Sequence, residues 1–225
     1  MSPAARAAAP PRRKPAPPAV PAVWARDVES VLIAEPALRR RVASLARQIN
    51  REYAGRDLVV VGLMTGSLVF LGDLLRQLTL PLAVDLMEIS SYGAGTVAGQ
   101  LVCTKNLSLP VRGRDVLVVD DILDTGRTLL AVKRRLQRKR PASLAVCVLL
   151  DKPSRRTEEI VPDYTGFQVP DVFVVGYGLD FAERYRNLPF VGVLKAEVYA
   201  SAGRPGGVRR PRASARPAAR RRTRS

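Results

Sequence analysis

The chain of 225 residues contains no histidine, and this absence excludes several kinds of catalytic and metal site. Zinc bound by histidine, Ser-His-Asp triads and Cys-His pairs all require an imidazole ring. The two cysteines, Cys103 and Cys147, lack CxxC spacing. Cys147 lies in the apolar run SLAVCVLL, where we expect a small buried residue. Any proton transfer must therefore use Asp, Glu, Lys or Tyr.

Long apolar runs are also missing. The chain has no stretch of 18 consecutive apolar residues, so we expect no membrane-spanning helix. Six prolines from Pro10 to Pro21 interrupt the apolar core that a signal peptide needs and the amphipathic helix that a transit peptide needs. We therefore expect a cytoplasmic protein that makes no membrane contact.

Acidic residues are absent from both ends of the chain. Residues 1–26 carry five basic side chains and residues 201–225 carry nine arginines, which account for most of the formal net charge of +17. Both segments are rich in Ala, Pro, Gly and Ser, so we interpret them as disordered tails around one domain, residues 27–200. The tails could bind nucleic acid nonspecifically, although a solvated tail is the simpler interpretation.

Between the tails, apolar runs alternate with amphipathic helical patterns. Apolar residues at intervals of four, three and four after Pro36 predict a helix over 36–53, and further helices are expected over 67–78 and 127–140. Continuous apolar runs predict strands over residues 57–66, 82–90, 116–122, 143–150, 172–178 and 190–194. This alternation predicts an α/β fold with a doubly wound, mostly parallel sheet, which binds ligands at the carboxyl ends of its strands.

The most informative stretch is VLVVDDILDTGRTLLAV, in which a strand ends in carboxylates and a helix begins at about Arg127. Free backbone N–H groups and the helix dipole at such a helix start favour an anion. Gly126 allows close approach of the backbone, and the hydroxyls of Thr125 and Thr128 are additional donors. The segment therefore predicts a phosphate site.

Three aspartates accompany this phosphate site. Asp120 and Asp121, at the strand end, suit hydrogen bonds from vicinal hydroxyls such as those of a ribose, and Asp124 is left for another task. Phosphate beside a diol indicates a sugar phosphate. The alternative is that Asp124 merely caps the helix.

Two acids followed by D-T-G-x-T resemble the phosphoribosyl pyrophosphate (PRPP) signature of the type I phosphoribosyltransferases. Other segments are similar to the 6-oxopurine branch of that family, the hypoxanthine-guanine phosphoribosyltransferases. VGLMTGSLVFLGDLL resembles its pyrophosphate loop, MEISSYGAG its mobile lid and LLDKPSRR its purine-recognition strand end. The segment from VPDYTGF to FVGVL resembles the base-binding region, so the resemblance runs from about Ile33 to Leu194.

This resemblance implies the type I phosphoribosyltransferase fold with a small base-binding hood, usually in a homodimer or homotetramer. It implies a Mg²⁺-dependent enzyme of purine salvage, which converts hypoxanthine or guanine and PRPP to IMP or GMP and pyrophosphate. The alternative is a regulator on the same fold that senses PRPP or a nucleotide and binds nucleic acid through its basic tails. The sequence does not rank hypoxanthine, guanine and xanthine.

By the same resemblance, Asp124 is the catalytic residue, placed near N7 of the purine to accept or donate a proton. Lys152 donates to the purine O6, Phe173 stacks on the base, Val174 offers backbone groups to its edge, and Asp180 lies beside the base site. The residues alone leave alternatives open. Lys152 could be a surface cation in an ion pair, and Phe173 and Val174 could be an ordinary core strand pair.

The resemblance also implies contacts to pyrophosphate and metal. Arg186 meets the pyrophosphate, although it could instead form a salt-bridged helix start with Asp180. Ser91 and Tyr92 belong to the lid, although their composition alone favours an ordinary flexible loop. The implied Mg²⁺ ligands are Asp120, Asp121 and Asp180. The implied PRPP-binding residues are Thr65, Gly66, Asp120, Asp121, Asp124, Thr125, Gly126, Arg127, Thr128 and Arg186.

One departure from the family pattern concerns Thr65, where the family commonly has Lys or Arg. Threonine removes a cation but keeps the backbone donors of the loop, which often contains a non-proline cis peptide at this step. Asp120 stands where many members have Glu, which is a milder change. We expect neither difference to abolish the activity.

Overall fold

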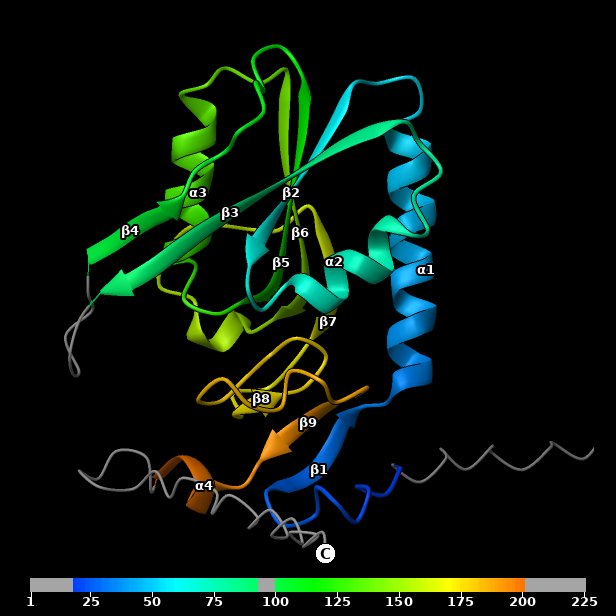
Figure 1. The fold of residues 1–225 in the computed structure, drawn as a ribbon, viewed down its shortest axis with the longest axis vertical. Helices are drawn as coiled ribbons and strands as arrows, with labels where there is room; N and C mark the ends of the chain where they lie inside the picture. Colours follow the sequence, from blue (N-terminus) through cyan, green and yellow to red (C-terminus); the bar gives the residue numbers. More distant parts are fainter. Residues whose placement is uncertain (1–17, 93–99, 201–225) are drawn as a thin grey trace, which may run out of the picture.

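The computed structural model describes residues 18–92 and 100–200, which form one large and one small sheet (Figure 1). The large sheet has the strand order β4-β3-β2-β5-β6-β7, and the small sheet has the order β1-β9-β8. The strands are β1 (Val28–Ile33), β2 (Leu58–Met64), β3 (Leu82–Tyr92), β4 (Gln100–Lys105), β5 (Asp115–Leu123), β6 (Ser143–Asp151), β7 (Tyr164–Gln168), β8 (Val174–Val175) and β9 (Val191–Leu194). The helices are α1 (Glu35–Glu52), α2 (Leu68–Leu75), α3 (Arg127–Gln137), the short 3-10 helix η1 (Pro153–Arg155) and α4 (Ala196–Ala200).

The large sheet is parallel except at one edge, where β4 pairs with β3 in the antiparallel direction. Alternate residues of β2 face opposite sides: Leu58 and Val60 join the apolar cluster that contains α1 and α2, whereas Val59 and Val61 join the cluster that contains α3. Both faces are therefore covered, which explains the continuous apolar runs of its central strands. The predicted doubly wound, mostly parallel α/β sheet is confirmed.

The helices follow the apolar spacing in the sequence. α1 buries one stripe, Leu38, Val42, Leu45 and Ile49, and exposes its arginine-rich face. α3 ends at Gln137, three residues before the predicted end. Arg140, which directly precedes Pro141, has a positive φ of 56°, so the backbone has left the helical conformation before the proline.

The small sheet lies beyond the carboxyl ends of the large sheet's strands (Figure 1). β9 pairs with β1 and β8 in the antiparallel direction. The predicted strand over 172–178 is reduced to the two residues of β8, because Gly176 and Tyr177 adopt positive φ values of 97° and 52° and turn the chain. The prediction of a long strand there is wrong, and the segment after β8 is a loop.

The sequence pattern did not predict β1, β4 and β7. We expect the domain to begin at residue 27. In the structure, residues 22–27 already form turns that lead directly into β1. Among the described helices, none combines the length and apolar composition needed to span a bilayer.

Candidate functional site

Three residues separate β5 from α3, and they form the start of the predicted phosphate site. Gly126 is the residue that precedes the helix, at φ 90°, and it has no side chain to cap the helix, while Oγ1 of Thr125 accepts the Arg127 N–H at the long distance of 3.5 Å. A Cβ atom there would lie 2.7 Å from Cγ2 of Ile160, so both backbone and space favour glycine. The alternative that Asp124 caps the helix is wrong. The uncapped helix start can donate to an anion.

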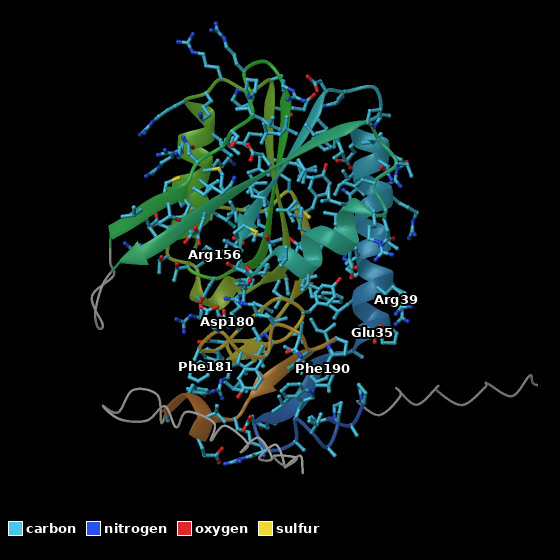
Figure 2. The ribbon with its side chains drawn as sticks, viewed as in Figure 1. Glu35, Arg39, Arg156, Asp180, Phe181 and Phe190 are labelled. Atoms are coloured by element: carbon cyan, nitrogen blue, oxygen red, sulfur yellow. The ribbon has the colours of Figure 1, made fainter. Side chains whose placement is uncertain are left out.

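This loop is anchored through its carbonyl groups. Nε of Arg156 donates to the Asp124 carbonyl at 3.0 Å, and the N–H groups of Thr157 and Glu158 donate to the Thr125 carbonyl at 3.0 and 3.2 Å. Figure 2 shows Arg156 near the lower end of the large sheet, above Asp180. Because C=O and N–H point in opposite directions across a planar peptide, the N–H groups that follow these carbonyls point away from residues 156–158.

Asp120, which is buried, and Asp121, which is partly buried, form a pair near the end of β5. Burial, followed by the negative charge of Asp121, raises the pKa of Asp120 well above its ordinary value. Burial likewise raises the pKa of Asp121, while hydrogen bonds and the charge of Arg186 oppose this shift. Because these shifts oppose two unpaired negative charges at this position, a bound cation or hydroxyl donors would favour the ionised form of the pair.

Within the described residues, no group of three or more His, Cys, Asp or Glu side chains is arranged to hold a metal ion. Asp120, Asp121 and Asp180 therefore do not make a complete metal site by themselves. Mg²⁺ usually takes one or two carboxylates together with water and substrate phosphates. The buried acid pair fits that mode of binding.

The loop between β2 and α2 contacts the acid pair. The Met64–Thr65 peptide is cis, as the resemblance implies for this loop. A Cβ atom on Gly66 would lie 1.8 Å from Oδ2 of Asp121, and one on Gly178 would lie 2.1 Å from the Gly66 carbonyl oxygen. The β2–α2 loop therefore lies between the acid pair and the loop after β8, with room for glycine alone at these contacts.

A pocket of about 490 Å³ opens between the large sheet and the small sheet. Its walls contain Asp124, Lys152, Phe173, Val174 and Asp180, which are all of the residues expected around the purine. These residues belong to separate segments of the sequence, and the fold brings them together. The pocket also contains residues that the sequence did not indicate, among them Ile122, Arg155, Asp171 and Tyr199.

Lys152 is a buried cation in this pocket. The residue is only 7% exposed, and its Nζ atom donates to the carbonyl of Val172 at 2.7 Å. Burial lowers the pKa of Lys152, whereas the charges of Asp124 and Asp171 oppose that shift. The burial does not fit a solvated surface cation. It suits a donor aimed at a carbonyl-type acceptor.

Phe173 is 39% exposed, which distinguishes it from an ordinary core residue. Its ring contacts the edge of Phe181, with centroids 5.5 Å apart, and stacks on Tyr199 at 5.1 Å with an interplanar angle of 19°. Val174 is buried in β8, where it pairs with Val193. The side chain of Phe173 therefore faces the pocket, whereas Val174 packs in the core and belongs to the pairing of β8 with β9.

Asp124 is held by an ion pair that the sequence did not indicate. Its Oδ1 atom lies 2.9 Å from Nε of Arg155, and Nη1 of Arg155 lies 3.5 Å from Oδ1 of Asp171. The Oδ1 atom of Asp124 is buried yet accepts no well-aligned hydrogen bond in the described chain. It therefore retains the capacity to accept a proton or a hydrogen bond from a ligand.

Arg186 and Asp180 form an ion pair of 3.0 Å, and Arg186 also pairs with Glu183. This salt bridge was the alternative interpretation, although residues 180–186 form turns and no helix. Arg186 is absent from the wall of the pocket that contains Lys152 and lines a second pocket of about 600 Å³, whose wall also contains Glu35 and Arg39 of α1. Figure 2 labels these two residues of α1. The charge of Arg186 nevertheless acts on Asp121.

Ser91 and Tyr92 lie at the end of β3. Their side chains, and the rest of the expected lid over residues 93–99, fall outside the described part of the chain. Their role in a lid stays a prediction.

Comparison with known proteins adds to this geometry. A family model for the phosphoribosyl transferase domain matches residues 30–182. The chain is 44% identical over 176 residues to the hypoxanthine-guanine phosphoribosyltransferase of Bacillus subtilis, covering 78% of this chain and 98% of that protein. It is 48% identical over 174 residues to the bifunctional protein TilS/HprT of Listeria monocytogenes, covering 77% of this chain but 27% of that much longer protein.

A solved structure of a hypoxanthine phosphoribosyltransferase from Staphylococcus aureus also matches, with a TM-score of 0.76 and 42% identity over 79% of this chain and 97% of that one. The family model covers more than half of the chain, and the Bacillus relative is matched over nearly its whole length. The chain therefore belongs to the hypoxanthine-guanine phosphoribosyltransferases.

Proposed function

We propose that the protein transfers the phosphoribosyl group of PRPP to N9 of hypoxanthine or guanine and releases pyrophosphate. The supporting observation is the single pocket that contains Asp124, the buried Lys152, Phe173 and Val174. A lysine ammonium donates to a 6-oxo group but meets another donor in a 6-amino group, which leaves both unpaired. The site therefore favours 6-oxopurines over adenine.

In the proposed reaction, a bond forms between C1′ and N9, the bond from C1′ to the pyrophosphate oxygen breaks, and the base loses a proton. Asp124 accepts that proton from N7, and its buried Oδ1 atom, which accepts no well-aligned hydrogen bond from the described residues, is suited to this role. The start of α3 binds the 5′-phosphate, and Asp120 and Asp121 bind the ribose hydroxyls. Phe173 stacks on the base and holds its N9 atom in position to form the bond to C1′ of the sugar.

Mg²⁺ is part of this proposal. Asp120, Asp121 and Asp180 would hold the ion together with substrate oxygens, and it would supply positive charge to the departing pyrophosphate. Arg186 adds a cation on the same side, and its charge already acts on Asp121. We also propose a homodimer or homotetramer, to be measured by light scattering. The regulator alternative depends on basic tails that lie largely outside the described residues, and no described contact favours it.

The decisive experiment mixes the purified protein with PRPP, Mg²⁺ and one base at a time, and measures pyrophosphate release. The bases are hypoxanthine, guanine, xanthine, adenine and uracil. We expect release with hypoxanthine or guanine, little with adenine or uracil, and loss of the reaction when EDTA removes the metal. No release with any base would contradict the proposed activity, whereas release that persists in EDTA would contradict the metal requirement alone.

A further inference from the structure

The loop after β8 contains several residues in a backbone conformation that usually requires glycine. Tyr177, Ala182, Glu183 and Tyr185 have positive φ values of 52°, 51°, 61° and 73°. A Cβ atom makes this left-handed region unfavourable, so such residues persist only where surrounding contacts hold them. The same loop carries both Asp180 and Arg186, which the proposed function places at the pyrophosphate.

Contacts within the loop do not fix its position relative to the rest of the protein. Oδ2 of Asp180 accepts the Glu183 N–H at 2.9 Å, and Arg186 pairs with both of these acids. External contacts must therefore place the loop. At its first end, the hydroxyl of Tyr177 donates to Oδ2 of Asp73 on α2 at 2.6 Å.

The second end of the loop is held by residues that precede β1. Tyr185 is buried, and its hydroxyl donates to Oδ2 of Asp27 at 3.1 Å. The ring of Trp24 meets the Tyr185 ring at 65°, with centroids 6.1 Å apart. Trp24 and Asp27 also line a cavity of about 450 Å³ together with Tyr185 and Arg186.

The segment that carries Trp24 and Asp27 is itself tied to the small sheet. The carbonyl of Asp27 accepts the N–H of Lys195 at 2.9 Å, and the Trp24 carbonyl accepts the N–H of Val28 at the same distance. Nζ of Lys195 donates to the Ala25 carbonyl at 2.8 Å. Residues 21–27 are therefore a fixed support, since they are bonded to both β1 and the residue that follows β9.

We propose that Trp24 and Asp27 are positioning residues that hold Tyr185, and through it set the place of Arg186 in the PRPP site. This inference rests on the proposed function. Both residues precede the range matched by the family model, which begins at residue 30. Since Tyr185 directly precedes Arg186, whereas Asp180 in the base pocket lies five residues earlier, the loss of these contacts weakens the use of PRPP more than the use of the purine base.

Three full-length variants test this proposal. Trp24→Ala removes the ring contact, and Tyr185→Phe removes only the hydroxyl that reaches Asp27. Tyr164→Phe is the matched control, because it deletes another phenol hydroxyl bonded to a carboxylate, that of Glu52 at the amino end of the large sheet. The KM for PRPP, the KM for the base at saturating PRPP and the melting temperature are measured for each variant.

We expect Trp24→Ala to raise the KM for PRPP about tenfold and Tyr185→Phe to raise it about threefold. The KM for the base should change less than about twofold, which is less than the loss of one neutral hydrogen bond to the base would cause. Tyr164→Phe should lower the melting temperature without changing either KM. An unchanged KM for PRPP in Trp24→Ala, or equal rises in both KM values, would overturn the proposal.

Hydrogen exchange separates this inference from the proposed function. Amides of the peptide that spans residues 176–188 should exchange faster in Trp24→Ala than in the unchanged protein, and at the ordinary rate in Tyr164→Phe. A protein inactive with every base would overturn the proposed function, and the exchange rates would still decide whether Trp24 holds the loop. Unchanged exchange in Trp24→Ala overturns the positioning role.

Discussion

The two sheets contribute differently to one site. In the large sheet, long apolar strands pair in regular parallel register, and Asp120 and Asp121 of β5 and Asp151 of β6 lie toward the carboxyl ends of their strands. In the small sheet, β8 has two residues, and the loop that follows it contains four non-glycine residues with positive φ. The large sheet therefore presents its charged groups on long regular strands, whereas the small sheet and its loop present Phe173, Asp180 and Arg186 on irregular backbone.

Removal of a charge from the large sheet should have the largest effect. In Asp124→Asn we expect turnover to fall by about two to four orders of magnitude, the range that general acid–base catalysis contributes. The control is Asp57→Asn, which changes an exposed carboxylate paired with Arg114 at 2.7 Å at the opposite end of the sheet. Initial rates of nucleotide formation measure both. Equal losses in the two variants would mean that Asp124 has no special role.

A change of shape at the β2–α2 loop should have the next largest effect. The Cβ atom in Gly66→Ala would lie 1.8 Å from Oδ2 of Asp121, so the carboxylate of Asp121 must move. We expect the KM for PRPP to rise about tenfold or more. Gly72→Ala, on α2, meets no atom within 4 Å and should leave KM unchanged while it stabilises the helix by about 0.5–1 kcal/mol. Denaturant titration and kinetics with varied PRPP check both expectations.

Loss of the aromatic surface in the small sheet should have a smaller and more selective effect. In Phe173→Leu the apolar contact is largely kept and the stacking is lost, so we expect the KM for hypoxanthine to rise about two- to tenfold. The KM for PRPP should stay the same, because the ring of Phe173 is proposed to contact the base alone. A rise in the KM for PRPP instead would show that the ring of Phe173 does not act on the base alone.

The smallest expected effect is a pH dependence of stability. Burial lowers the pKa of Lys152 below its ordinary value of 10.5, so between the lowered value and 10.5 the unfolded chain binds more protons than the folded one. The free energy of unfolding therefore rises with pH through that window, and Lys152→Met lacks this component. Urea titrations of both proteins from neutral pH to about 10.5 measure it. If the free energies of unfolding of the two proteins change in parallel with pH, the lowered pKa of Lys152 is contradicted.

The sequence predicts the parts of the fold that are buried on both faces. β2, β5 and β6 are continuous apolar runs, and they lie in the interior of the large sheet. The two strands of that sheet that were not predicted, β4 and β7, are its edge strands. An edge strand is paired on one side only, so QLVCTK and YTGFQ mix polar and apolar residues and carry little periodic signal.

The site residues, too, could be predicted from the sequence only in part. Asp124 and Lys152 directly follow buried strands, so their meeting at one edge of the sheet could be predicted from topology. Arg155 and Tyr199 reach the pocket from a 3-10 turn and from the short helix α4, and no local pattern marks them. Their contacts depend on how the small sheet packs on the large one. That arrangement is set by pairings between segments far apart in the chain.

The contact between Trp24 and Tyr185 joins two residues on opposite flanks of the range that the family model matches, residues 30–182. A shortened protein cut at those limits would lose both rings and the carboxylate of Asp27, although every strand of the large sheet would be intact. Engineers who trim this enzyme or attach a fusion partner should keep the chain from Pro21 onward and through the end of α4, so that Lys195 is retained. Otherwise they would delete a support whose loss is not apparent from sequence similarity.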